Sequence, residues 1–167
     1  MVQLDEIGDW TYTSAMQTVA NQFADYASYH RTSGNKLFHR IGIPLIMLSL
    51  LGMLARVVFL RNGLWQLDAA LILIVLTQIY YLRLEWRLGL AMLLASVAFY
   101  GIGRALPFWS LIVLFVSGWV LQFIGHGVYE KKQPAFTRNL IHLLIGPLWI
   151  LNDVVGAVPA VSLETRG

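Results

Sequence analysis

The stretch Pro107-Phe-Trp-Ser-Leu-Ile-Val-Leu-Phe-Val-Ser-Gly-Trp-Val-Leu-Gln-Phe-Ile124 decides the fold class of this chain. It contains no charged residue. A helix needs roughly 17–25 apolar residues to cross the hydrocarbon core of a bilayer, and this stretch is long enough. The sequence therefore predicts a membrane-spanning helix over residues 107–124.

The overall composition agrees with a membrane protein. The chain has 167 residues, of which 57% are hydrophobic and 13% are charged. This is too apolar for an ordinary soluble domain, so we expect a single membrane domain over residues 1–167. The net charge of +3 is scattered along the chain, and nucleic-acid binding is not expected. The chain has no cysteine, which excludes disulfides and thiolate metal sites.

Three further apolar runs precede this stretch and predict spans over residues 43–60, 64–82 and 88–102. The last of these is short for a span. Pro44 fits the first turn of the first span, where a missing N–H costs nothing. Arg61-Asn62-Gly63 is typical of a short turn between two spans. The expected fold is an all-α integral membrane bundle with about four transmembrane helices.

A shorter helix is expected at each side of this bundle. Residues 13–30 place apolar side chains at three- and four-residue spacing, which predicts an amphipathic helix. Residues 140–151 are apolar but too few to span easily, and Gly146-Pro147 interrupts them. We interpret them as an interfacial or re-entrant helix in preference to a fifth span.

An even number of spans returns the chain to the side of the membrane on which it began. That side collects most of the basic residues: Arg31, Lys36, Arg40, Arg83, Arg87, Lys131, Lys132 and Arg138. The opposite side has only Arg56, Arg61 and Arg104. The positive-inside rule therefore places the N-terminus in the cytoplasm.

The four histidines form two clusters that this topology brings to the same cytoplasmic face. His30 and His39 precede the first span, whereas His126 and His142 follow the last one. Neutral imidazole is a common metal ligand, so we expect a metal site at this face. Iron, zinc, manganese and copper all accept imidazole and carboxylate ligands, and the residues do not choose among them. The competing interpretation is that the histidines are hydrogen-bonded surface residues.

Other side chains near the histidines are candidates for supporting roles. In a continuous helix Gln122, His126 and Glu130 share one face, so Glu130 can bind the metal or orient the imidazole. Three basic residues can hold a fatty carboxylate or an acidic lipid headgroup, or can simply set the topology: Arg40, Lys131 and Lys132. Further candidates to hydrogen-bond the site are Tyr26, Tyr29, Asp25 and Asp153. The six tryptophans are interpreted as belt or packing residues.

The two histidine clusters together resemble the signatures of the 2-hydroxy fatty acid dioxygenase family. The first signature is carried by Tyr29-His30-Arg31, Asn35, His39 and Gly42-Ile-Pro44. The second is carried by Gln122-Phe-Ile-Gly-His126-Gly-Val-Tyr-Glu130-Lys-Lys-Gln-Pro134-Ala. Residues 140–147 are similar to the closing segment of the family, and the likeness runs from about residue 20 to residue 153. Asp153 stands where a glutamate is expected.

The resemblance implies an Fe(II)-dependent enzyme of fatty acid α-oxidation in the membrane. Such an enzyme cleaves a 2-hydroxy fatty acid with O2 to give CO2 and an acid that is one carbon shorter. Carried over to this chain, the family's iron ligands are His30, His39, His126 and His142. A nearby Arg or Lys would orient the substrate carboxylate.

Three alternatives stay open from the sequence. A b-type cytochrome would use two of the histidines as axial haem ligands, although such ligands usually lie within spans. A non-enzymatic lipid-binding membrane protein would bind no metal. A zinc hydrolase is the weakest of the three.

Overall fold

The computed structural model describes residues 18–63, 65–137 and 139–158, and most of them are helical. An N-terminal helix over residues 18–28 comes first. The later elements are α2 (Ser33–Leu54), β1 (Val58–Asn62), β2 (Trp65–Asp68), α3 (Ala69–Leu84), α4 (Trp86–Ala105), α5 (Phe108–Ile124), η1 (Gly125–Glu130), η2 (Ala135–Thr137) and α6 (His142–Val155). The predicted all-helical class is confirmed, with one short hairpin added.

Among the described residues, three helices are long and apolar enough to cross a membrane. They cover Ser33–Leu54, Trp86–Ala105 and Phe108–Glu130. The two other apolar helices, Ala69–Leu84 and His142–Val155, are shorter. The predicted runs 88–102 and 107–124 therefore correspond to α4 and α5. Helix α4 is longer than its apolar run, because Trp86, Arg87 and Arg104 also adopt helical conformation.

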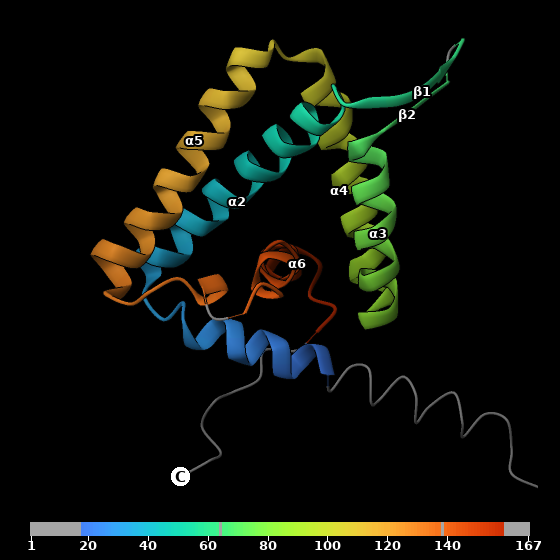
Figure 1. The fold of residues 1–167 in the computed structure, drawn as a ribbon. Coiled ribbons are helices and arrows are strands. Elements are labelled where there is room, and N and C mark those ends of the chain that lie inside the picture. Colours follow the sequence, from blue (N-terminus) through green and yellow to red (C-terminus); the bar gives the residue numbers. More distant parts are fainter. Residues whose placement is uncertain (1–17, 64, 138, 159–167) are drawn as a thin grey trace, which may run out of the picture.

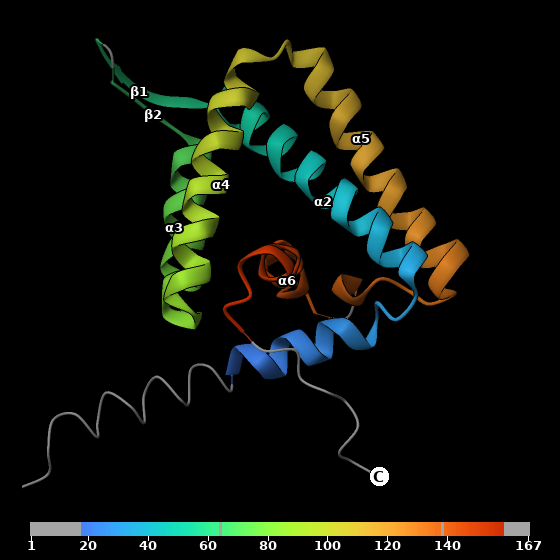
Figure 2. The ribbon, with the colours of Figure 1, turned by 180° about the vertical axis from the view of Figure 1, so that it is seen from behind.

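The long helices form two arms of an inverted V (Figure 1). One arm pairs α2 with α5, the other pairs α3 with α4, and α2 also contacts α4. The N-terminal helix crosses the open side of the V, and α6 lies between it and the arms (Figure 2). Apolar residues of the N-terminal helix, α3, α4 and α6 pack there into one core cluster.

The first predicted span is misplaced along the sequence. Helix α2 begins at Ser33, and Thr32 caps it by accepting a hydrogen bond from the Asn35 amide at 3.3 Å. Pro44 consequently lies inside the helix, whereas the sequence analysis predicted it in the first turn. A proline in a helix interior removes one backbone hydrogen bond, but the remaining apolar stretch keeps the helix together. As a result His39 lies on the helix itself.

The predicted end of the first span and the predicted start of the second span are wrong, because residues 58–68 form a β-hairpin. Strands β1 and β2 pair antiparallel, with Asn62 opposite Trp65. Gly63 between them has a positive φ of 56°, which glycine adopts without strain. A glycine at the first position of a two-residue loop is a recognised hairpin signal, and the sequence analysis overlooked it because the flanking residues are apolar. Leu64 lies outside the described residues.

The predicted amphipathic helix over residues 13–30 is found over residues 18–28, and Tyr29 and His30 follow it outside the helix. Its inward face is buried through Val19, Phe23 and Tyr26, in agreement with the predicted spacing. Residues 13–17 of this prediction lie outside the described part of the chain. Helix α6 replaces the predicted 140–151 segment, and its interfacial or re-entrant placement stays a prediction.

Two glycines let the arms of the V meet. A Cβ built on Gly103 of α4 would lie 2.7 Å from the Cα atom of Gly52 on α2, and one built on Gly52 would meet Gly103 at 2.9 Å. These are backbone atoms, so they cannot move aside as a flexible side chain can. Small residues at such crossings allow close helix packing in membranes.

We expect Gly103→Ala to destabilise the protein by roughly 1–3 kcal/mol, because the added methyl group overpacks the crossing. The matched control is Gly101→Ala on the same helix, where an added Cβ meets nothing within 4 Å. Thermal unfolding of both variants in detergent measures the difference. Equal melting temperatures for the two variants would show that the crossing tolerates the methyl group.

Candidate metal centre

Three histidines from three separate segments meet at the open side of the V. His30 follows the N-terminal helix, His39 lies on α2, and His126 lies in η1, which continues α5. One ring nitrogen from each lies within 4.8 Å of the others. The ring centroids are 4.4 Å apart for His30–His39, 4.9 Å for His30–His126 and 4.8 Å for His39–His126. We call these three residues the histidine triad.

Backbone carbonyls fix the orientation of two triad rings. His30 donates from Nδ1 to the carbonyl of Tyr26 at 2.7 Å, and His39 donates from Nδ1 to the carbonyl of Asn35 at 2.9 Å. Both Nε2 atoms therefore carry the lone pair that a metal needs. Metal-binding histidines typically donate their second nitrogen in this way.

The triad is buried, and several of its nitrogens have no partner. All three residues are at most 3% exposed. Among the described residues, none forms a hydrogen bond with Nε2 of His30 or Nδ1 of His126. A buried polar atom without a partner costs free energy, and a bound ion would remove that cost. The donor set fits a metal that accepts imidazole nitrogen.

Burial also keeps His30 in the form that binds metals. The pKa of His30 is lowered to about 4, mainly by burial, and the nearby His126 acts in the same direction. The carbonyl of Tyr26 acts in the opposite direction but does not offset the burial. His30 is therefore neutral at physiological pH. The ring of Tyr26 stacks on it, with centroids 4.0 Å apart.

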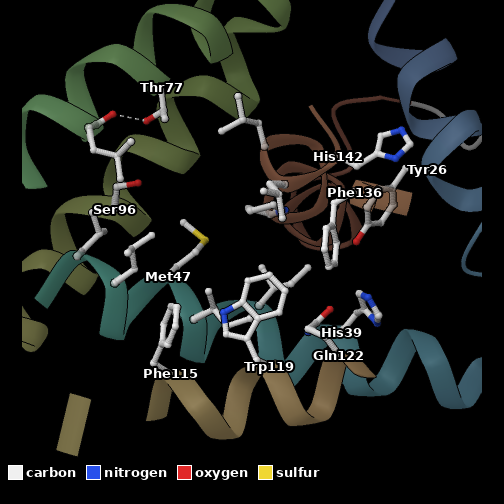
Figure 3. Close-up of a pocket in the computed structure, with 18 of the residues that line it drawn as sticks. Tyr26, His39, Met47, Thr77, Ser96, Phe115, Trp119, Gln122, Phe136 and His142 are labelled. Carbon is white, nitrogen blue, oxygen red and sulfur yellow. Dashed lines mark hydrogen bonds between the residues drawn. The ribbon is translucent and has the colours of Figure 1, made fainter. Parts of the chain in front are cut away.

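The fourth histidine lies beside the triad and not within it. His142 begins α6 and donates from Nε2 to the Asp25 carboxylate at 2.8 Å. Its Nδ1 is buried and has no partner among the described residues. Its ring lies 5.9 Å from that of Tyr26, and both side chains line the same cavity as the triad (Figure 3). The structure thus brings three of the four predicted ligands within reach of one ion.

Glu130 hydrogen-bonds residues at the start of α2, and its part in binding a metal or orienting the imidazole stays a prediction. Its carboxylate accepts hydrogen bonds from the amides of Arg31 and Thr32, each at 3.1 Å. It also accepts from the Thr32 hydroxyl at 3.0 Å and from Nδ2 of Asn35 at 3.2 Å. The π-helical turn η1 directs it there, because the α-helical face expected for His126 and Glu130 ends at Ile124. Glu130 thus ties the end of η1 to the start of α2.

Gly125 allows η1 to approach α2 closely. A Cβ built there would lie 2.5 Å from Oδ1 of Asn35 and 3.4 Å from Nδ1 of His39. Any larger residue would therefore push His126 away from His39. π-Helical turns of this kind are frequent at functional sites.

The predicted substrate-binding residues lie outside the main cavity. Arg40 forms an ion pair with Asp153 at 2.6 Å, which joins α2 to α6. Tyr29 and Lys132 line a second, more polar pocket together with Arg31. Lys131, at the end of η1, is exposed and has a positive φ of 54°. Their part in substrate binding stays a prediction.

The main cavity has a volume of about 290 Å³ and extends from the triad between the two arms. Its wall includes residues that the sequence analysis did not assign to a site: Ile43, Met47, Thr77, Ser96, Phe115 and Phe136. Trp119, interpreted from the sequence as a belt or packing residue, also lines it. Phe115, Trp119, Gln122 and His126 recur at three- and four-residue spacing, a signal that could have revealed this wall.

Comparison with known proteins shows the family of this chain. Residues 16–158 match the family model described as 2-hydroxy-palmitic acid dioxygenase Mpo1-like. The chain is 35% identical over 136 residues to the 2-hydroxy-palmitic acid dioxygenase MPO1 of Saccharomyces cerevisiae, and the match covers 78% of this chain and 76% of the relative. No solved structure matches. The chain therefore belongs to the Mpo1-like family of 2-hydroxy-palmitic acid dioxygenases.

Proposed function

We propose that this protein is an Fe(II)-dependent dioxygenase that cleaves 2-hydroxy fatty acids. The C1–C2 bond breaks, and the acid and O2 become CO2, water and a fatty acid one carbon shorter. The four electrons that reduce O2 come from the two carbons of the broken bond. The observation that carries this proposal is a buried histidine triad at one end of an apolar cavity.

The residues of the triad would hold the iron through Nε2 of His30, Nε2 of His39 and one nitrogen of His126. When bound, Fe(II) with open coordination positions allows O2 and the substrate's hydroxyl and carboxylate to meet at one centre. The protein contributes fixed imidazole orientation through the carbonyls of Tyr26 and Asn35. It also contributes a dry surrounding, because the triad is buried.

We assign His142 to the same site as the fourth histidine. Its Nε2 atom is engaged with Asp25, so Nδ1 is the nitrogen that has no partner among the described residues. From the cavity wall this nitrogen can complete the metal ligands or accept a hydrogen bond from the substrate's 2-hydroxyl group. Asp25 holds the tautomer in both cases.

The polar end of the substrate needs partners besides the metal. Gln122 lines the cavity one helical turn before His126 and is 4% exposed. Its Nε2 atom is buried and has no partner among the described residues. We therefore assign it to the substrate's carboxylate or hydroxyl group. Tyr29, Lys131 and Lys132 remain candidates for an entering carboxylate, whereas Arg40 is engaged with Asp153.

The fold suits a substrate that is dissolved in the membrane. We propose that α3 joins the three long apolar helices as a fourth span, which places the metal centre and the N-terminus on the cytoplasmic side. The excess of Lys and Arg at that face supports this orientation. An acyl chain could then stay among apolar side chains while its head group meets the metal.

The geometry disfavours a haem held between two residues of the triad. Each pair of triad rings is in edge-to-face contact at less than 5 Å between centroids. This leaves no room for a porphyrin between any two of them.

Purified protein loaded with Fe(II) is expected to convert 2-hydroxypalmitate and O2 into pentadecanoate and CO2. The chain-shortened acid is measured by mass spectrometry under air and under argon. His126→Ala removes one triad nitrogen, so it should retain its helical content but lose most bound iron and at least 100-fold in rate. Iron-loaded, folded wild type that forms no pentadecanoate would refute the proposed reaction.

Glu130→Gln is expected to lower iron affinity about 10- to 100-fold, because the link that holds η1 against the start of α2 loses its charge. The matched control is Glu85→Gln. Glu85 is a buried carboxylate that accepts from the Leu88 amide at the start of α4. Both variants should lose stability, but only Glu130→Gln should lose iron affinity, measured by competition with a chelator. Equal affinity losses would mean that Glu130 acts only through overall stability.

A further inference from the structure

The cavity follows one face of α2 away from the histidine triad. Its lining residues on this helix recur at three- and four-residue spacing and are His39, Ile43, Ile46, Met47, Leu50 and Leu51. The distance along the helix from the first to the last is roughly 18 Å at a rise of 1.5 Å per residue. The cavity is therefore long in the direction of the helices.

Helix α5, which packs against α2 in the same arm, extends this wall. Gln122, Trp119 and Phe115 follow His126 at successive turns as the helix is traced back from η1. Figure 3 shows His39, Gln122 and His142 at one end of the cavity and Ser96 and Thr77 at the other. The polar head group and the methyl end of a fatty acid would thus lie at opposite ends of the cavity.

A packed cluster closes the end that lies opposite the triad. Leu51 and Ile74 line the cavity and also belong to a buried cluster with Ala55 and Ala70. Ser96 of α4, only 6% exposed, completes this wall. We call Leu51, Ile74 and Ser96 the cavity floor.

The region beside the floor offers little to a polar ligand. The Thr77 hydroxyl donates to the carbonyls of Leu73 and Ile74, so its hydrogen is already engaged within α3. Among the described residues, no Lys, Arg, Asp or Glu lines the cavity. A hydrocarbon tail matches these surroundings.

We infer that the cavity floor sets the chain length of the 2-hydroxy acid, with the acyl chain lying between the α2–α5 arm and the α3–α4 arm and its methyl end on the floor. This inference rests on the proposed function. The triad fixes the head group, so the distance to the floor decides how many methylenes find a buried place. A longer acid must bend, and a shorter acid leaves apolar wall uncovered.

Each buried methylene of the substrate multiplies its affinity for the cavity by a constant factor. For an acid supplied as a monomer in water, burying one methylene favours binding by about fourfold. Chains that fill the cavity should therefore gain steadily in specificity constant with each added carbon. Beyond the filling length the gain should stop or reverse.

The test compares kcat/KM for saturated 2-hydroxy acids of 10 to 20 carbons. Ser96→Leu fills the floor by about two methylenes, so the preferred length should shorten and the longest acids should lose about tenfold relative to acids two carbons shorter. Leu50→Ala enlarges the cavity beside the floor, so the profile should move toward longer acids. Matched controls are Ala98→Leu and Leu94→Ala, two substitutions on the exposed face of α4.

Opposite shifts in Ser96→Leu and Leu50→Ala, with unchanged control profiles, would support the inference. If Ser96→Leu fails to fold, the direction of the Leu50→Ala shift decides alone. Wild type that is active on the series, with a profile that neither folded variant moves, would overturn the inference while leaving the proposed function intact. Wild type that converts no member of the series would instead refute the proposed function.

Discussion

The hydrogen bonds between Glu130 and the first residues of α2 hold together the segments that carry the histidines. Arg31 and Thr32, whose amides they engage, follow His30 directly and precede the helix that carries His39. Glu130 itself ends the π-helical turn that carries His126. A carboxylate at a helix N-terminus also interacts favourably with the helix dipole. One side chain thus fixes the relative position of three imidazoles that are distant in sequence.

The second constraint is the cost of burying polar groups beside apolar helices. Backbone carbonyls of Tyr26 and Asn35 satisfy one nitrogen of His30 and of His39, and Asp25 satisfies one nitrogen of His142. Nε2 of His30, Nδ1 of His126 and Nδ1 of His142 are buried and have no partner among the described residues, and a bound ion would remove the cost of leaving such nitrogens unpaired. The same arrangement therefore determines both the tautomer of the rings and the direction in which they can bind.

Much of this molecule could be predicted from the sequence, and the parts that could not have physical reasons. The apolar runs identified α4 and α5. The predicted topology grouped the four histidines, and the structure brings three of them together in a triad that could hold a metal. The hairpin at residues 58–68 was missed because Val58, Phe59 and Leu60 are as apolar as a span. The start of α2 was placed too late because its first turns are polar where they approach Glu130 and the triad. The role of Glu130 depends on a π-helical turn, which no sequence periodicity reveals.

Iron content combined with X-ray absorption at the iron edge tests most directly whether the triad holds one ion. Purified protein loaded with Fe(II) should contain one iron per chain, with scattering from at least three imidazole ligands. Replacing His30, His39 and His126 together by alanine should abolish both signals. Iron that shows no imidazole scattering, or that binds the triple variant as tightly as the wild type, would contradict a metal centre built on the triad.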